Sequence, residues 1–211
     1  LPGKHLYFLD DHLLGNQKFA AALFDGMKGM NRVFHGASTI DAIVRGDLIE
    51  KAADAGMRSV FVGFETLNKA NLAQGNKKQN IGKNYTDAIK RLHSLGIMIN
   101  GSFVFGLDDD DKDVFKRTID WAVENALTTC TFHILTPYPG TQLFADMERD
   151  GRIVTRDWDL YDTRHVVYKT KHISSTDLKS GYDWSYKEFY SWRNIISASL
   201  NHDSIKHILN S

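Results

Sequence analysis

The sequence has little of what marks several common classes of protein. Its 211 residues contain one cysteine, Cys130, which excludes an internal disulfide framework and is typical of a reducing compartment. No apolar run approaches the roughly 20 residues of a membrane-spanning helix, and no signal peptide opens the chain. Lys and Arg number 26, as do Asp and Glu, so no excess positive charge indicates nucleic-acid binding. We therefore expect a cytoplasmic protein with no transmembrane segment and no nucleic-acid partner.

Several catalytic motifs are also missing. The chain has no Walker loop, nucleophile elbow, histidine zinc motif or dinucleotide glycine fingerprint. Cys130 by itself is expected to be a small buried hydrophobe. The acidic run 108–111 suggests a metal site at first sight, but we interpret it as the negative first turn of a helix, which the helix dipole favours. The adhesion tripeptide at 45–47 is predicted inside a helix and is treated as chance.

Strand-like and helix-like stretches alternate along the first 150 residues. Apolar, β-prone runs precede helical stretches at 5–9, 32–38, 58–64, 97–105 and 131–135. This alternation is typical of a parallel α/β sheet with right-handed crossovers. Without a dinucleotide fingerprint, it favours a partial (β/α) TIM-type barrel over a Rossmann sheet. The polar stretch 68–84 predicts a long loop or a short helix.

The stretch 131–144, TFHILTPYPGTQLF, organises this pattern. A β-prone run stops at two prolines, which withdraw backbone donors, and Thr141 can then cap a helix that ends at Gly151. Beyond it the pattern changes, and aromatic residues crowd a helical tail. We expect two domains: a partial βα barrel over 1–151 and a C-terminal helical, aromatic-rich extension over 152–211.

Polar residues gather where the predicted strands end. In a βα barrel these ends open on one face, so they predict one site there. Helix capping explains any single one of them about equally well. The candidates are Asp10, Asp11, Ser38, Glu65, Gly106 and Thr136, with His35, His133 and Tyr138 as candidates on the substrate side. We interpret His133 preferentially as a core histidine whose hydrogen bonds are made within the protein, and alternatively as a ligand or base.

Four segments resemble the radical S-adenosylmethionine (SAM) family, in the branch that carries an N-terminal cobalamin-binding domain. They are 8–11 (FLDD), 62–66 (VGFET), 100–107 (NGSFVFGL) and 135–141 (LTPYPGT). The segments 158–162 and 189–190 are similar to the C-terminal region of members that modify hopanoids and related lipids. The family's fold is a partial (β/α)6 barrel.

This resemblance implies an iron–sulfur oxidoreductase or methyltransferase. Such an enzyme cleaves SAM reductively to a 5′-deoxyadenosyl radical at a [4Fe–4S] cluster, with an electron donor, a small-molecule or lipid-like substrate, and cobalamin through the N-terminal domain. By position, Asp10 and Asp11 match residues near the SAM amino group, and Glu65 one near its sugar or methionine part. The remaining cofactor-binding candidates are Ser38, the adenine-lining Phe103, Phe105, Gly106 and Leu107, and the adenine-edge residues Leu135 and Thr136.

One feature that the family requires is missing from this sequence. Three cysteines in a CxxxCxxC loop hold the cluster, and this chain has only Cys130. We therefore expect a chain that lacks the first strand and the cluster loop and is inactive by itself.

Two other classes of function remain open. One is a cluster-free βα-barrel enzyme acting on a phosphorylated metabolite, which would favour a glycine-rich phosphate cradle where only Gly140 is present. The other is a non-catalytic binding module that uses the aromatic stretch 184–192 as its surface.

Overall fold

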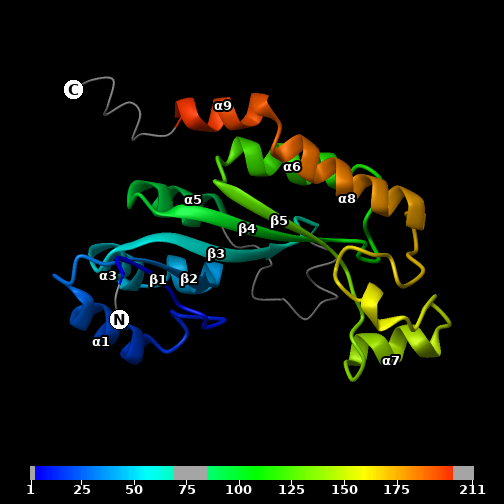
Figure 1. Cartoon of the computed structure of the whole chain (residues 1–211), viewed down its shortest axis with the longest axis horizontal. Coiled ribbons are helices and arrows are strands. Elements are labelled where there is room, and N and C mark those ends of the chain that lie inside the picture. The colour runs from blue at the N-terminus through cyan, green and yellow to red at the C-terminus, as the bar shows by residue number, and fades with distance from the viewer. Residues whose placement is uncertain (1–2, 69–84, 202–211) are drawn as a thin grey trace. The chain divides into compact units, whose positions relative to one another are not determined.

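The computed structural model describes residues 3–68 and 85–201, and it alternates strands with helices over most of this length (Figure 1). The expected loop at 68–84 lies, apart from Asn68, outside the described residues. The elements in chain order are β1 (His5–Tyr7), α1 (Gln17–Met27), β2 (Val33–Ser38), α2 (Ile40–Val44), α3 (Leu48–Asp54), β3 (Met57–Glu65), α5 (Tyr85–Ser94), β4 (Met98–Phe105), α6 (Val114–Glu124), β5 (Thr129–Ile134), α7 (Gln142–Arg149), the 3₁₀ turn η2 (Trp158–Leu160), α8 (Ser175–Phe189) and α9 (Trp192–Asn201).

The strands follow one another across the sheet in the order β1-β2-β3-β4-β5. The first two pairs are parallel, with Leu6 opposite Phe34 and Ala37 opposite Phe61. A doubly wound Rossmann sheet reverses direction at its centre, whereas a βα barrel adds each strand beside the previous one. The sequential order is therefore barrel topology, and the predicted α/β class, a partial TIM-type barrel, is confirmed.

Two compact units divide the chain. Among the described residues, the first holds 3–64, 85–102 and 127–130, and the second holds 65–68, 103–126 and 131–201. The boundaries of the two units fall within β3, β4 and β5. They do not test the domain boundary expected at residue 151, which stays a prediction.

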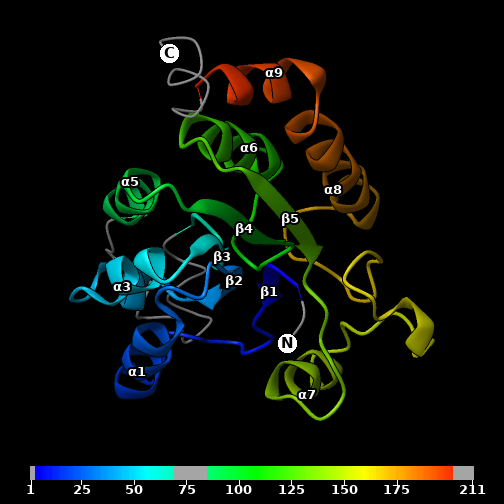
Figure 2. The same cartoon turned by 60° about the vertical axis from the view of Figure 1, so that its left-hand side comes forward.

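In the first unit, short helices cover the buried faces of the strands. Helix α1 packs against α3 (Figure 2). Helix α2 packs against α5. Phe24 of α1 stacks on Phe34 of β2 with ring centroids 5.8 Å apart. The predicted cap of α1 is present, because the Asn16 side chain accepts a hydrogen bond of 3.1 Å from the Phe19 backbone N–H.

One prediction in this unit is wrong. Residues 40–54 form two helices instead of one, because Gly46 takes a left-handed φ of 61° that ends the first helix. The guanidinium of Arg91 from α5 lies at the break. It donates to the Ile43 carbonyl oxygen at 2.9 Å and pairs with the Glu50 carboxylate at 2.5 Å. The tripeptide at 45–47 therefore forms the helix break and is not helical.

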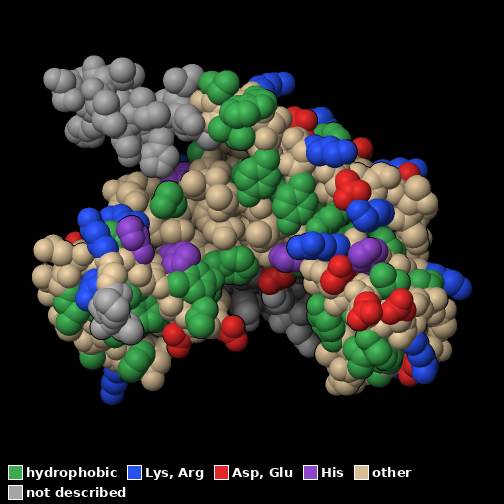
Figure 3. All heavy atoms as spheres, in the orientation of Figure 1, with side chains coloured by type: hydrophobic (Ala, Val, Ile, Leu, Met, Phe, Trp, Pro, Cys, Tyr) green, Lys and Arg blue, Asp and Glu red, His purple; other side chains and the backbone are tan. Residues whose placement is uncertain are grey.

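In the second unit, α6 packs against α8 (Figure 2). The buried residues of α8 recur at helical spacing, so this helix is amphipathic; they are Leu178, Tyr182, Ser185 and Phe189. Its other face and α9 carry exposed hydrophobic side chains, which Figure 3 shows over α9. Trp184 is 38% exposed and Trp192 is 79% exposed. Tyr168, in the segment before α8, forms an antiparallel bridge with Ile153.

Candidate functional site

The strands that carry the predicted site have two different faces. In β5, Phe132 and Ile134 are buried, and the Phe132 ring meets Tyr186 and Phe189 of α8 at 5.1 and 6.1 Å. Alternate residues point to the opposite face of a strand, where Thr131 and His133 are only half-buried. A ligand at this strand end would therefore meet His133 and not the aromatic rings.

Glu65 lies at the end of β3 with an unusual backbone. Its φ is 65°, which is uncommon for a residue other than glycine. Strained backbone conformations are concentrated at active and ligand-binding sites, where the surrounding structure holds them in place. The next residue, Thr66, is buried, and its hydroxyl accepts a 3.1 Å hydrogen bond from the Asn68 backbone N–H. The turn that carries the Glu65 carboxylate is therefore fixed.

His133 is held by Thr163, within electrostatic range of the Glu65 carboxylate. Its Nδ1 lies 3.2 Å from the hydroxyl of Thr163, which also has a left-handed φ of 64°. The Thr163 carbonyl accepts a 2.7 Å hydrogen bond from the Ile134 N–H. Burial lowers the pKa of His133, and the nearby Glu65 carboxylate opposes that shift. A largely neutral imidazole can accept or donate a hydrogen bond to a ligand.

Phe103 and Phe105 belong to the segment predicted to line the adenine, a role that stays a prediction, and the structure places their side chains in the core. Phe103 and Phe105 are each 1% exposed. Phe105 meets Phe115 at 4.8 Å, and both rings stack on Phe132 at 6.0 and 5.7 Å. Their side chains lie on the helix-covered face of β4. The part of 103–107 that can face a ligand is therefore the turn at Gly106 and the half-buried Leu107.

That turn is closed by a buried carboxylate. Asp110 is 1% exposed and accepts hydrogen bonds from the Gly106 and Leu107 N–H groups at 2.9 and 3.0 Å. The prediction that 108–111 forms the first turn of a helix is wrong, because α6 begins only at Val114. Aspartate side chains compete with helix formation by binding nearby backbone N–H groups.

Asp108 is the centre of an ion cluster in the same turn. Arg152 approaches its carboxylate with both terminal nitrogens, at 2.7 and 3.2 Å, and the Lys171 ammonium lies at 2.7 Å. Burial raises the pKa of Asp108, but the hydrogen bonds from Arg152 and Lys171 outweigh it and hold that pKa below its ordinary value. Within residues 3–68 and 85–201, no group of three His, Cys, Asp or Glu residues is placed to hold a metal ion.

The Asp108 cluster predicts a pH-dependent stability. A lowered folded-state pKa means that the cluster stabilises fully above the ordinary value of 3.8 and loses this contribution as the pH falls through the folded-state pKa. We expect Asp108→Asn to lower the free energy of unfolding by about 1–2 kcal/mol near neutral pH and by less in acid. Urea unfolding at both pH values measures the difference.

Asp120→Asn is the matched control for this prediction. Its carboxylate pairs with Lys116 on an exposed surface, so the substitution is expected to leave stability nearly unchanged at both pH values. A cost for Asp108→Asn that stays constant from neutral to acid pH would contradict the pKa shift.

The loop after β5 holds the remaining predicted residues of this unit. The Leu135 N–H donates to the Phe105 carbonyl at 2.9 Å, which aligns the two strand ends. Thr136 is buried, and its hydroxyl donates to the Ile134 carbonyl at 3.0 Å. Tyr138 is exposed. Thr141 caps α7 as predicted, by accepting a 3.2 Å hydrogen bond from the Phe144 N–H.

The other predicted residues lie in the first unit. Asp10 and Asp11 are exposed after β1. His35 meets the Tyr7 ring edge-on at 3.8 Å, and burial lowers its pKa. Ser38 is buried, and its hydroxyl donates weakly to the Thr39 carbonyl at 3.4 Å. Each of these roles stays a prediction.

Cys130 is buried, as predicted. Burial raises the pKa of its thiol, which disfavours the thiolate that binds metals. A [4Fe–4S] cluster takes several thiolates, and this chain has one cysteine. The residues present therefore do not fit a cluster.

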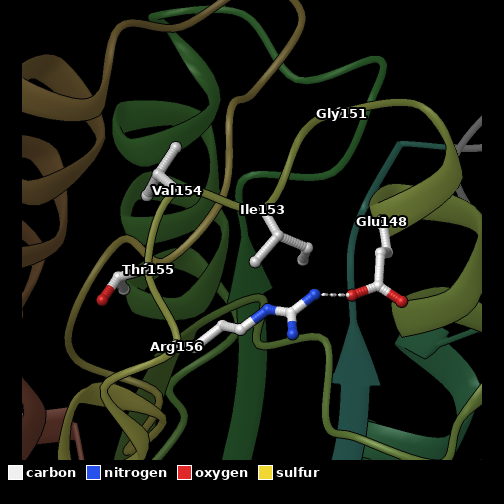
Figure 4. Close-up of a pocket in the computed structure, with 6 residues that line it drawn as sticks. All are labelled: Glu148, Gly151, Ile153, Val154, Thr155 and Arg156. Carbon is white, nitrogen blue, oxygen red and sulfur yellow. Dashed lines mark hydrogen bonds and ion pairs between the residues drawn. The ribbon is translucent and has the colours of Figure 1, made fainter.

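The second unit also has a cavity, drawn with its lining residues in Figure 4. Its volume is about 360 Å³. The Arg156 guanidinium and the Glu148 carboxylate form an ion pair at this cavity. The residues that line it are Glu148, Gly151, Ile153, Val154, Thr155 and Arg156, and none of them belongs to the predicted site.

The sequence did not indicate Asp110, Arg152 or Tyr168 as neighbours of the Gly106 turn. The Tyr168 hydroxyl donates to the Gly106 carbonyl across 62 residues of chain. A contact at that separation leaves no local pattern. The acidic run 108–111 could have indicated the role of Asp110 only if it had been interpreted as a turn in which an aspartate side chain accepts hydrogen bonds from nearby backbone N–H groups.

Comparison with known proteins identifies relatives. No protein-family model matches the chain. It is 31% identical over 183 residues to the bacteriochlorophyllide d C-12(1)-methyltransferase of Chlorobaculum tepidum, covering 87% of this chain and 40% of that protein. It is 25% identical over 158 residues to the hopanoid C-2 methylase of Rhodopseudomonas palustris, covering 72% of this chain and 30% of that protein. The chain thus spans less than half the length of these relatives.

A solved structure gives the same fold. The radical SAM methyltransferase TsrM from Kitasatospora setae, with cobalamin and a [4Fe–4S] cluster bound, superposes with a TM-score of 0.60 and 14% identity, over 73% of this chain and 32% of that chain. Among residues 3–68 and 85–201, no helix is both long and apolar enough to cross a membrane. In sequence the chain is similar to these methyltransferases, and its fold is that of radical SAM enzymes.

Proposed function

We propose that this chain forms the part of a radical SAM methyltransferase that binds the nucleoside of SAM. The observation that carries the proposal is the 31% identity to a bacteriochlorophyllide methyltransferase over 87% of this chain. The radical SAM fold supports it, because ligands of βα barrels bind at the carboxyl ends of the strands.

The proposed roles differ in what supports them. Glu65 and the Gly106–Leu107 turn lie at strand ends of the second unit, and the strain at Glu65 supports a ligand-binding role. Leu135 and Thr136 are proposed at the adenine edge. The roles of Asp10, Asp11 and Ser38 depend on sequence resemblance alone. His35, His133 and Tyr138 are proposed to face the substrate, and of these His133 has the best-defined geometry.

The whole protein is proposed to cleave SAM reductively and to act on a small-molecule or lipid-like substrate in the cytoplasm, with an electron donor and cobalamin. A [4Fe–4S] cluster supplies the electron for that chemistry. Because Cys130 does not fit as a cluster site, the cluster ligands must come from outside this chain. We therefore propose that this chain binds SAM but carries out no radical chemistry by itself.

Isothermal titration with SAM, 5′-methylthioadenosine and methionine tests this proposal. We expect the chain to bind SAM and 5′-methylthioadenosine and to bind methionine much more weakly. Glu65→Gln should weaken the affinity for SAM by at least about tenfold, since a hydrogen bond to a charged group contributes about 1.5–3 kcal/mol.

Glu124→Gln is the control, because Glu124 is exposed at the end of α6. It should leave the affinity for SAM unchanged. Failure of the unsubstituted chain to bind either adenosine-containing ligand would contradict the proposed nucleoside site. Formation of 5′-deoxyadenosine by this chain alone, under anaerobic reducing conditions, would contradict the proposed inactivity.

A further inference from the structure

Two side chains occupy both polar groups of the Gly106 backbone. Its N–H donates to the Asp110 carboxylate at 2.9 Å, and its carbonyl accepts from the Tyr168 hydroxyl. The neighbouring Leu107 is engaged in the same way, since its N–H donates to Asp110 at 3.0 Å and its carbonyl accepts from the Asp110 N–H at 3.0 Å. Both N–H groups of the turn therefore have partners and each carbonyl accepts one hydrogen bond, which holds the turn in one conformation.

These hydrogen bonds restrict what the turn can offer to a ligand. The two N–H groups already have partners, so they are not free to donate to a purine, and each carbonyl already accepts one of its two possible hydrogen bonds. The Leu107 side chain is half-buried and presents an apolar surface. Flat apolar contact, not hydrogen-bond donation to the base edge, is what this turn can supply to a nucleoside.

Tyr168 reaches Gly106 from the tail of the chain, and its own position is fixed. It is fully buried, and its segment pairs with 152–154 through backbone hydrogen bonds of 3.0 Å from Val154 to Val167 and 2.7 Å from Lys169 to Arg152. The Arg152 guanidinium lies 5.8 Å from the centre of the Tyr168 ring, within the range of a cation–π interaction. The same Arg152 also binds Asp108 in the turn.

Burial raises the pKa of Tyr168, so its hydroxyl keeps its proton and remains a donor at neutral pH. Gly106 has a left-handed φ of +91°, and a methyl group there would overlap the Tyr168 hydroxyl oxygen. The hydroxyl therefore lies directly over the α-carbon of Gly106, and a change in its position would be transmitted to the turn.

We propose that Tyr168 is a positioning residue for nucleoside recognition: by holding the Gly106 carbonyl, it places the Leu107 side chain against the adenosine part of SAM. This inference rests on the proposed function. It also assigns part of the predicted C-terminal extension to the cofactor site, where the sequence indicated only an appended subdomain.

Tyr168→Phe tests the inference, because it removes the hydroxyl and keeps the ring. We expect the affinity for SAM and for 5′-methylthioadenosine to fall by the same factor of about ten, which corresponds to about 1.4 kcal/mol of binding free energy. Equal losses would show that the adenosine part, common to both ligands, is affected. Isothermal titration of both ligands measures the two factors.

Tyr161→Phe is the matched control. Tyr161 is also a buried tyrosine of the tail, but its hydroxyl donates to the Thr155 backbone carbonyl, at 2.8 Å, and not to the Gly106 turn. We expect Tyr161→Phe to lower the thermal stability about as much as Tyr168→Phe does and to leave the affinity for both ligands unchanged. If Tyr168 had only a structural role, Tyr168→Phe and Tyr161→Phe would change the ligand affinities to the same extent.

Three results would overturn the inference: unchanged affinity in Tyr168→Phe, an equal loss in Tyr161→Phe, or a loss for SAM without a loss for 5′-methylthioadenosine. If Tyr168→Phe does not fold, Asp108→Asn gives the second test, because it loosens the same turn through Arg152 and should weaken both ligands by a smaller, equal factor. An unsubstituted chain that binds neither ligand would instead overturn the proposed function itself.

Discussion

Gly106→Ala is expected to destabilise the chain by about 3 kcal/mol. Its left-handed φ of +91° costs a residue with a side chain about 1–2 kcal/mol. The added methyl would overlap the Tyr168 hydroxyl and lie 2.9 Å from a methyl carbon of Leu178, and such overpacking costs about 1–3 kcal/mol more. Urea unfolding followed by circular dichroism measures the loss.

Gly151→Ala separates these two contributions. Gly151 also has a left-handed φ, of +64°, but an added methyl would meet nothing within 4 Å. We therefore expect only the conformational cost, about 1 kcal/mol. Equal costs at the two positions would show that the Tyr168 hydroxyl does not press on Gly106.

The predictable parts of this fold are those with local causes. The caps at Asn16 and Thr141 follow from side chains that bind the backbone N–H three residues later. The break at Gly46 was missed because a glycine inside a helical pattern is often tolerated. In this structure the Arg91 side chain donates a hydrogen bond to the Gly46 carbonyl at the break. Arg91 lies 45 residues away in the chain, so no local sequence pattern indicates this contact.

The candidate site shows the same limit. Glu65 could be selected because it follows an apolar strand directly, and its backbone strain gives that choice a structural basis. The alternation of β4 shows that Phe103 and Phe105 share one face, but not which face the helices cover. That depends on Phe115 of α6 and on Phe132 of the next strand, which are distant in the sequence, so the core position of the two rings could not be predicted.

Phe132→Ala is expected to have the largest effect of the substitutions considered. The ring is 1% exposed. It stacks on Phe103 and Phe105 on one side and meets two rings of α8, Tyr186 and Phe189, on the other. Truncating a buried phenylalanine costs about 3–5 kcal/mol, which for a chain of this size lowers the melting temperature by roughly 10 °C.

The reason for so large a value is that this ring joins the strands to the tail. The Tyr186 hydroxyl lies 3.1 Å from the Phe132 backbone N–H and 3.2 Å from its carbonyl oxygen, so the cavity left by alanine would also loosen a polar contact. Phe19→Ala, at a ring that is 60% exposed on α1, should cost less than about 1 kcal/mol. Similar melting temperatures for the two variants would mean that α8 does not depend on β5 for its packing, and the tail would then be a separate domain.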